Sequence, residues 1–111
     1  MTSLRVSAAG QVMVLAGEAD MTTVRQLTEA LGARLAEPAT HLTIDISGLC
    51  FADASSVRLL AAAAATFVSR GGNLVLTSPQ PSVRRMLTLL CLDGTLTIRS
   101  DPAAGLGYYE T

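Results

Sequence analysis

The chain has 111 residues, enough for one compact domain of ordinary size and little more. Eight arginines, no lysine, nine acidic residues and one histidine give a formal net charge of −1, so overall charge favours neither nucleic acid nor an anionic membrane surface as a partner. The longest apolar run, Leu59 to Ala65, is far shorter than the roughly 20 residues of a membrane-spanning helix. The N-terminal segment lacks the basic leader and apolar block of an export signal, so we expect a cytoplasmic protein.

Hydrophobic periodicity predicts alternating strands and helices. Alternating or short continuous apolar runs indicate strands, and apolar residues three and four positions apart indicate helices. Two β-prone runs on either side of a small-residue turn predict an N-terminal hairpin. The expected strands cover residues 4–7, 11–16, 42–47, 74–76 and 96–98. The expected helices cover residues 23–37, 57–70 and 78–90.

Capping residues predict where these helices begin and end. Thr23 with Gln26 fits a capping box at the start of the first helix, and Pro38 ends that helix. Ser78 is expected to cap the third helix, with Pro79 at its first position.

The order of elements predicts an α/β fold: a mixed sheet of four to five strands with an N-terminal hairpin, covered by three to four helices. Residues 1–99 are expected to form this one domain. Residues 100–111 are expected to be a C-terminal tail, either a frayed helix or disordered.

Few residues offer catalytic or metal-binding chemistry. Cys50 and Cys91 lie among apolar neighbours without metal-ligand spacing, and we expect buried free thiols. The only histidine, His41, has no nucleophile motif around it and is expected at an exposed strand edge, and the chain has no phosphate-binding loop motif. We therefore expect no enzyme activity, no cofactor and no metal site. A small enzyme with His41 or Cys50 in a ligand pocket is the catalytic alternative.

The segment between the third strand and the second helix, residues 48–56, is expected as a loop that ends in Asp53-Ala54-Ser55-Ser56. In one interpretation, Asp53 or one of the serines simply caps the helix. In the other, an exposed hydroxyl at the helix N-terminus accepts a phosphate, whose charge of about −1.5 to −2 would repel a docked partner. The residues by themselves leave both interpretations open.

Six short motifs follow one another in a fixed order over residues 4–98. They are Gly17-Glu18-Ala19-Asp20, Ile44 to Leu49, Phe51 to Ser55, Gly71 to Leu76, Ser78-Pro79 and Val83 to Leu87. In order and spacing they resemble the STAS domain of bacterial anti-sigma-factor antagonists.

The resemblance implies a modified serine. In the family this loop reads Asp-Ser-Ser/Thr-Gly, and its second hydroxyl residue is phosphorylated. Anchored on Phe51 and Asp53, that position is Ser55 here, with Ser56 as the alternative. Ala54 replaces the first hydroxyl and Ser56 replaces the glycine, which adds a Cβ where the partner is expected to approach. The residues expected to face the partner are Glu18, Asp20, Thr22, Asp53, Ser56 and Arg58.

The resemblance also implies a mechanism of partner switching. The unphosphorylated protein binds an anti-sigma factor that is also a serine kinase, phosphorylation at Ser55 releases it, and a phosphatase resets the switch. ATP and magnesium belong to the kinase, and the free protein is expected to be a monomer without membrane insertion or direct contact with nucleic acid. An alternative, which the changes at Ala54 and Ser56 allow, is an unphosphorylated STAS regulatory subunit of a membrane transport ATPase or a scaffold complex.

Overall fold

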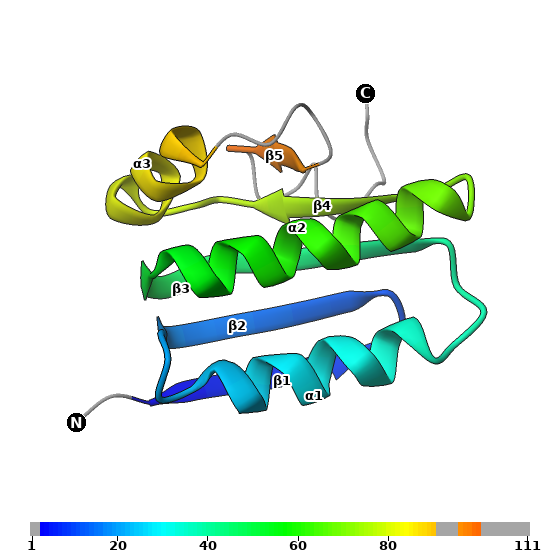
Figure 1. Ribbon diagram of the computed structural model, residues 1–111, viewed down its shortest axis with the longest axis horizontal. Coiled ribbons are helices and arrows are strands. Elements are labelled where there is room, and N and C mark those ends of the chain that lie inside the picture. The colour runs from blue at the N-terminus through cyan, green and yellow to red at the C-terminus, as the bar shows by residue number, and fades with distance from the viewer. Residues whose placement is uncertain (1–2, 91–95, 101–111) are drawn as a thin grey trace.

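The computed structural model describes residues 3–90 and 96–100, and it confirms the mixed α/β fold (Figure 1). The strands are β1 (Leu4–Ala9), β2 (Val12–Ala19), β3 (His41–Ala52), β4 (Asn73–Thr77) and β5 (Thr97–Arg99). The helices are α1 (Val24–Leu35), α2 (Ala54–Ser69) and α3 (Pro81–Leu89). The expected C-terminal tail lies outside the described residues, apart from Ser100.

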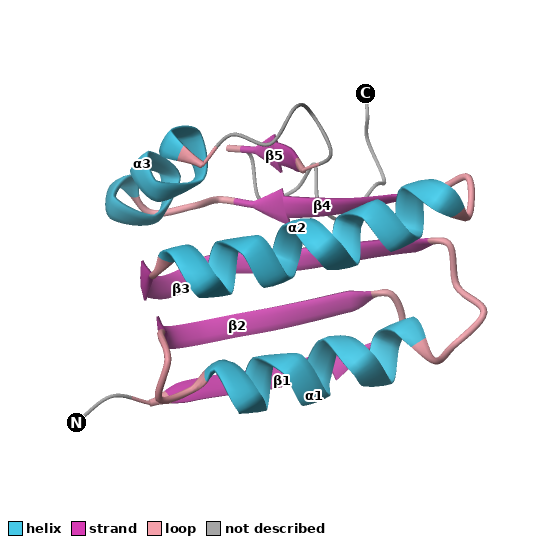
Figure 2. Cartoon of the chain, in the orientation of Figure 1, coloured by secondary structure: helices cyan, strands magenta, loops and turns pink. Residues whose placement is uncertain are grey.

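The sheet is mixed because of its N-terminal hairpin. The strand order is β1-β2-β3-β4-β5. β1 pairs antiparallel with β2, and the remaining neighbouring pairs, β2 with β3, β3 with β4 and β4 with β5, are parallel. Successive right-handed crossovers in one direction place their helices on one face of such a sheet. In Figures 1 and 2, α1 and α2 accordingly lie side by side across one face.

The core lies between the sheet and these two helices. Leu27 and Leu31 of α1 are buried, and Leu60 and Phe67 of α2 face the same core. Ala63 and Ala64 are also buried, and small side chains let α2 lie close to the strands. Burying each large side chain favours folding by about 1.5–3 kcal/mol. The platform that carries the loops is therefore well packed. The strands contribute Leu4, Met13, Leu15, Leu42, Ile44, Ile46, Leu49, Leu74 and Leu76 to this core.

β2 and β3 extend furthest beyond their predicted C-terminal ends. β2 continues to Ala19 and β3 to Ala52, so the loops expected at 17–22 and 48–56 shrink to short connections. Their extra residues pair with each other, Gly17 with Leu49 and Glu18 with Phe51. Shifts of register interrupt the alternation of apolar and polar residues here, and the sequence pattern therefore did not predict where these two strands end.

The side-chain caps predicted for the first and third helices are wrong. Thr23 is the N-cap residue of α1 but makes no cap hydrogen bond, and Gln26 instead donates through Nε2 to the carbonyl of Leu4 at 2.6 Å. The third helix begins at Pro81, two residues after Pro79, which was expected at its first position. Ser78 stays outside it because its N–H donates to the carbonyl of Arg99 in β5 at 2.7 Å, in a left-handed conformation with φ of 58°.

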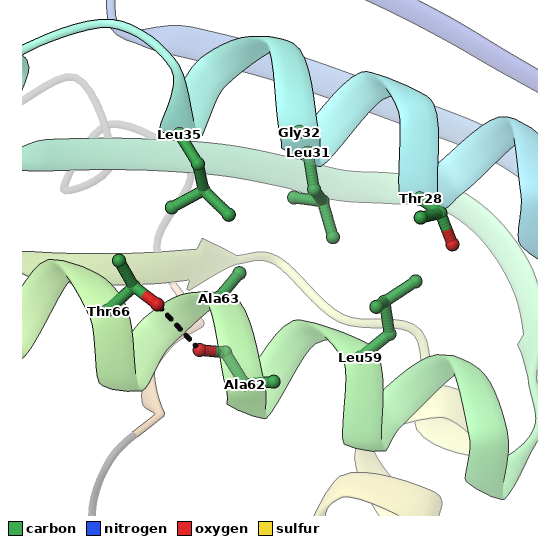
Figure 3. Close-up of a pocket in the computed structure, with 8 residues that line it drawn as sticks. All are labelled: Thr28, Leu31, Gly32, Leu35, Leu59, Ala62, Ala63 and Thr66. Carbon is green, nitrogen blue, oxygen red and sulfur yellow. Dashed lines mark hydrogen bonds between the residues drawn. The ribbon is translucent and has the colours of Figure 1, made fainter.

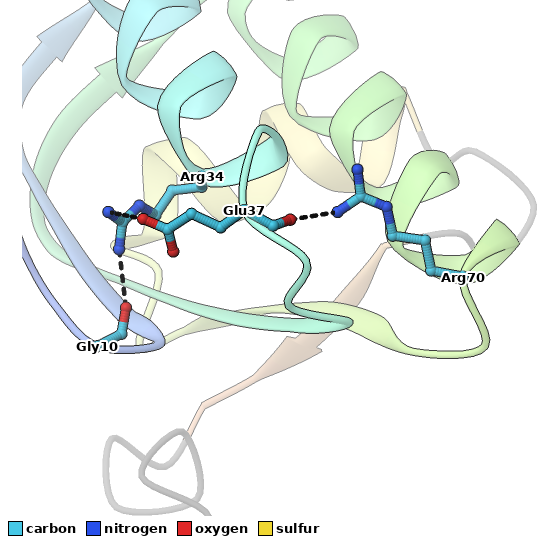
Figure 4. Close-up of polar contacts among 4 residues, drawn as sticks. All are labelled: Gly10, Arg34, Glu37 and Arg70. Carbon is cyan, nitrogen blue, oxygen red and sulfur yellow. Dashed lines mark hydrogen bonds and ion pairs between the residues drawn. The ribbon is translucent and has the colours of Figure 1, made fainter.

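Two arginines fasten the end of the molecule where α1 and α2 finish (Figure 4). Arg70 donates to the carbonyl of Leu35 at 2.7 Å and to that of Glu37 at 3.1 Å. Arg34 donates to the carbonyl of Gly10 at 2.8 Å and forms an ion pair with the Glu37 carboxylate at 2.9 Å. These contacts join the hairpin turn, the segment after α1 and the end of α2.

Candidate partner-binding site

The carboxyl ends of β2 and β3 bring two connections together at the other end of the molecule. The Asp53 N–H donates to the carbonyl of Ala19 at 2.9 Å, which ties the residue before α2 to the last residue of β2. Because parallel strands end at the same edge of a sheet, Asp20 and Asp53 follow neighbouring strands there. The residues that the sequence singled out around Asp20 and Asp53 therefore do share one edge.

Asp53 is the N-cap of α2. Its backbone is extended, with φ of −90° and ψ of 176°, and its Oδ1 accepts the N–H of Ser56 at 2.9 Å. The same oxygen accepts the hydroxyl of Ser55 at 2.8 Å. The capping interpretation is thus correct for Asp53, and it leaves the Ser55 hydroxyl at the surface, held by a carboxylate.

The two serines at the start of α2 differ completely in exposure. Ser55 is exposed, whereas Ser56 has 0% of its surface exposed. Ser56 therefore does not meet the expectation of a partner contact or of an alternative acceptor at the surface. Its Cβ points into the domain and away from an approaching partner, because Ser56 shares the buried side of α2 with Val57 and Leu60.

A compact turn presents the residues after β2. The Asp20 carboxylate accepts the N–H of Thr22 at 2.9 Å and its hydroxyl at 2.6 Å. The Thr23 hydroxyl is buried, accepts the N–H of Asp20 at 3.0 Å and donates to the carbonyl of Glu18 at 2.9 Å. These bonds fix the backbone on both sides of Met21.

Hydrogen bonds keep both carboxyl groups ionised. Burial raises the pKa of Asp53, but donors from Ser56 and Ser55 more than offset it, so that pKa lies below its ordinary value. The Thr22 hydroxyl lowers the pKa of Asp20, against smaller opposing effects of desolvation and of the Asp53 charge. Within the described residues the one ion pair is Arg34 with Glu37, at the opposite end. Asp20 and Asp53 therefore carry charges that no ion pair neutralises within the described residues, and the exposed Arg58 lies nearby on α2.

The remaining predicted contact residues lie around these turns. Glu18 is half-buried, and its carboxylate accepts the N–H of Ser3 at 3.1 Å. Thr22 is exposed next to Asp20, and Arg58 is exposed about one turn along α2 from Ser55. Whether these side chains touch a partner stays a prediction.

Two exposed apolar residues at this edge were missed by the sequence reasoning. Met21 is 79% exposed and Phe51 is 44% exposed. Met21 stands among polar residues, from Asp20 to Thr23, and that contrast was the available signal, whereas Phe51 lies close to the apolar Leu49 and offers no such contrast. Phe51 pairs with Glu18, whose neighbour Ala19 faces the buried side, so Phe51 lies on the sheet face away from the helices.

The residues considered for catalysis lie apart from one another. Cys50 is exposed, which contradicts the expectation of a buried thiol, because it follows the shift of register in β3. Cys91 lies outside the described residues. His41 is exposed at the start of β3, as expected, and a ring nitrogen lies 2.9 Å from Oδ1 of Asn73. Cys50 and His41 are thus near opposite ends of one strand.

A shallow apolar groove of about 220 Å³ runs between α1 and α2 (Figure 3). Leu31 and Leu59 line it from opposite sides. Its two hydroxyls are engaged by their own helices, Thr28 with the carbonyl of Val24 and Thr66 with that of Ala62. The groove therefore offers packing surface but no reactive group.

Within residues 3–90 and 96–100, no three His, Cys, Asp or Glu side chains converge to hold a metal ion. No helix in the same residues is both long and apolar enough to cross a membrane.

Comparisons with known proteins agree with this architecture. An anti-sigma factor antagonist from Mycobacterium paratuberculosis shares 28% identity and a TM-score of 0.78, over 96% of this chain and 92% of that one. Bacillus SpoIIAA in its phosphorylated form shares 18% identity and a TM-score of 0.68, over 95% and 97% of the two chains. A chain of the stressosome, a signal integration and transduction hub, shares 25% identity and a TM-score of 0.61, over 93% of each.

A comparison with curated protein sequences finds no relative. The family described as "Mlab, STAS domain" matches residues 2–99. The match spans all five strands and three helices that the structure describes. The chain therefore belongs to the STAS domain family.

Proposed function

We propose that this protein is an anti-sigma factor antagonist that is switched by phosphorylation of Ser55. Unphosphorylated, it binds an anti-sigma factor with serine-kinase activity and thereby frees a sigma factor in the cytoplasm. Phosphorylated, it releases that partner, and a phosphatase restores the binding form. The observation that carries the proposal is the exposed Ser55 hydroxyl, held 2.8 Å from the Asp53 carboxylate at the N-terminus of α2.

The position of Ser55 suits both states of the switch. An exposed hydroxyl at the start of a 16-residue helix accepts a phosphate without displacing the core, and the positive end of the helix dipole favours the added charge. The phosphate replaces a small neutral hydroxyl beside Asp53 with a group of about −1.5 to −2 charge. Added bulk and repulsion from Asp53 then disturb the surface that the partner contacts. Asp53 orients the hydroxyl, while ATP and magnesium belong to the kinase.

The similar structures support this role. The Mycobacterium paratuberculosis protein is an anti-sigma factor antagonist whose length is matched almost completely. SpoIIAA, whose likeness shows the fold alone, has been described in a phosphorylated form. On this proposal the protein is a regulator and not an enzyme, and it is a monomer when free.

The test uses the purified anti-sigma factors with serine-kinase domains from the source organism. Each is incubated with ATP, magnesium and wild-type protein, Ser55→Ala, Ser56→Ala or Ser69→Ala. Ser69 is a matched control because it is an exposed serine at the far end of the same helix. We expect intact-mass analysis to show one phosphate on every form except Ser55→Ala. Phosphate on Ser55→Ala, or on none of the proteins, contradicts the proposal.

Binding provides the second readout. Ser55→Ala is expected to bind the kinase as wild type does and to stay bound in the presence of ATP. Ser55→Asp is expected to bind more weakly, because a carboxylate then faces Asp53. Equal affinity of both variants, together with retained phosphorylation, would show that Ser55 is not the switch.

A second candidate function is an unphosphorylated regulatory subunit of a membrane transport ATPase or of a scaffold complex. Two observations favour it: the altered residues Ala54 and Ser56 beside Ser55, and the similarity to a stressosome chain. A pull-down with wild type and Ser55→Asp, read by mass spectrometry, separates the candidates. Retention of a kinase by wild type alone supports switching, whereas retention of a transporter ATPase or a scaffold by both forms supports the alternative.

A further inference from the structure

Met21 is the most exposed large apolar side chain in the described part of the chain, at 79% of its surface. A single exposed apolar residue is ordinary on a protein surface. Its place in the fold distinguishes this one, because it lies at the tip of the turn after β2, beside the proposed phosphorylation site.

Met21 and Ser55 lie in two segments that hydrogen bonds link. The Ser55 hydroxyl donates to Asp53 Oδ1 at 2.8 Å. The Asp53 N–H donates in turn to the carbonyl of Ala19, two residues before Met21, at 2.9 Å. A standard protein interface covers about 800 Å² on each partner, so a protein engaged at Ser55 would also cover Met21.

The turn is built to hold Met21 outward. Asp20 bonds to Thr22, and Thr23 bonds back to Asp20 and Glu18, so both sides of Met21 are fixed in the free protein. A residue presented by a rigid turn loses little conformational freedom when it binds. A methionine side chain is unbranched and polarizable, and so adapts to an apolar pocket.

The charge around Met21 indicates what borders such a pocket. Glu18 lies near the end of β2, and Asp20 and Asp53 follow β2 and β3. None of the three forms an ion pair within the described residues, and they outnumber the exposed Arg58 nearby on α2. A partner surface that complements them presents arginine or lysine side chains around an apolar centre.

We propose that Met21 is the apolar anchor by which this edge selects its anti-sigma factor, inserting into an apolar pocket that basic residues border. The inference rests on the proposed function and adds to it a residue that determines affinity and is itself not modified. Ser55 then controls when the partner binds, and Met21 determines how tightly.

The test measures the affinity of four proteins for the anti-sigma factor kinase that binds wild type, by calorimetry without ATP. Met21→Gln keeps the length of the side chain and removes its apolar character, whereas Met21→Leu keeps the apolar volume. Val68→Gln is the matched control, because Val68 is 49% exposed and lies about 20 Å from Ser55 along α2. Thermal unfolding of each variant checks that the exposed substitutions leave the fold intact.

We expect Met21→Gln to raise Kd about 10-fold or more, Met21→Leu to stay within about 3-fold of wild type, and Val68→Gln to stay within about 2-fold. Unchanged affinity of Met21→Gln, or equal losses for Met21→Gln and Val68→Gln, would overturn the role of Met21 while the proposed function stands. If no anti-sigma factor kinase binds wild type, the proposed function fails, and this inference fails with it.

Discussion

Ser55 and Ser56 are consecutive residues, yet one hydroxyl is exposed and bonded to Asp53 while the other is completely buried. The Ser56 hydroxyl has no hydrogen-bond partner of good geometry, although it lies close enough to Asp53 to contribute to the low pKa of that carboxyl. Two chemically identical side chains therefore have unlike roles, and each can be removed separately.

Ser56→Ala is expected to leave stability unchanged or to raise it by up to about 1 kcal/mol. Burying a hydroxyl without a full hydrogen bond opposes folding, and alanine removes that group while keeping the Cβ. Urea denaturation measures the difference. A loss of more than about 1 kcal/mol would show that Ser56 forms a stabilising hydrogen bond that the geometry does not reveal.

Asp53→Ala is expected to destabilise the protein by about 1 kcal/mol at neutral pH, because α2 loses its N-cap acceptor. Asp53→Asn is the matched variant, since asparagine caps a helix about as well as aspartate. Chemical denaturation of both variants separates the loss of the cap from the loss of the charge. Equal destabilisation would show that the charge, and not the cap, stabilises the start of α2.

The stabilising effect of the Asp53 charge is expected to depend on pH. The pKa of Asp53 in the folded protein lies below its ordinary value of 3.8. The charge therefore stabilises the fold above the unfolded pKa, and this stabilisation is lost as pH falls through the folded pKa. Wild type minus Asp53→Asn should give a difference in unfolding free energy that is constant above about pH 5 and falls below about pH 4. Asp20 is present in both proteins, but its contribution cancels only in part, because the Asp53 charge raises the pKa of Asp20 in wild type and Asp53→Asn removes that charge. A difference in unfolding free energy that does not change with pH would contradict the lowered pKa of Asp53.

Gly17→Ala is expected to destabilise the protein by at least about 2 kcal/mol. Gly17 has a φ of 104°, and an added Cβ would overlap the carbonyl oxygen of Ser3. That carbonyl accepts the N–H of Glu18 at 2.7 Å, so the substitution would also disturb the end of β2 that carries the site.

Gly32→Ala is the matched control for Gly17→Ala. Gly32 lies inside α1, and a Cβ there meets open space. Alanine at this position is expected to stabilise the helix by about 0.5–1 kcal/mol. Thermal or urea unfolding should therefore give effects of opposite sign for the two glycines. If Gly32→Ala lowered stability, the finding that a Cβ at Gly32 meets no other atom would be contradicted.

Periodicity predicted the order of strands and helices because residues such as Leu27 and Leu31 face the core at helical spacing. It missed the ends of β2 and β3, because Gly17 and Phe51 stay in the sheet through pairing between strands distant in sequence. The direction of Ser56 was hidden for a related reason. With α2 beginning at Ala54, Ser56 lies four positions before the buried Leu60 and so falls on the buried side; a helix expected to begin at Val57 leaves it in a loop.

The site itself was predicted in part. The resemblance singled out Ser55 and Asp53, and the structure brings them within hydrogen-bond distance. Met21 was not predicted: its polar neighbours indicated a turn, but its exposure depends on the hydrogen bonds of Asp20 and Thr23 that fix the turn around it.

The bonds that Arg34 and Arg70 make lie at the end of the molecule farthest from Ser55 (Figures 1 and 4). At one end of the domain, guanidinium groups stabilise the fold by hydrogen bonds to backbone carbonyls, and at the other end lie Ser55 and Met21, which we propose bind the partner. Substitutions of the exposed Met21 side chain are therefore expected to change how a partner is bound without destabilising the fold, whereas substitutions of Arg70 are expected to change thermal stability without altering partner binding. A chain organised in this way is able to diverge in specificity and in stability along separate paths.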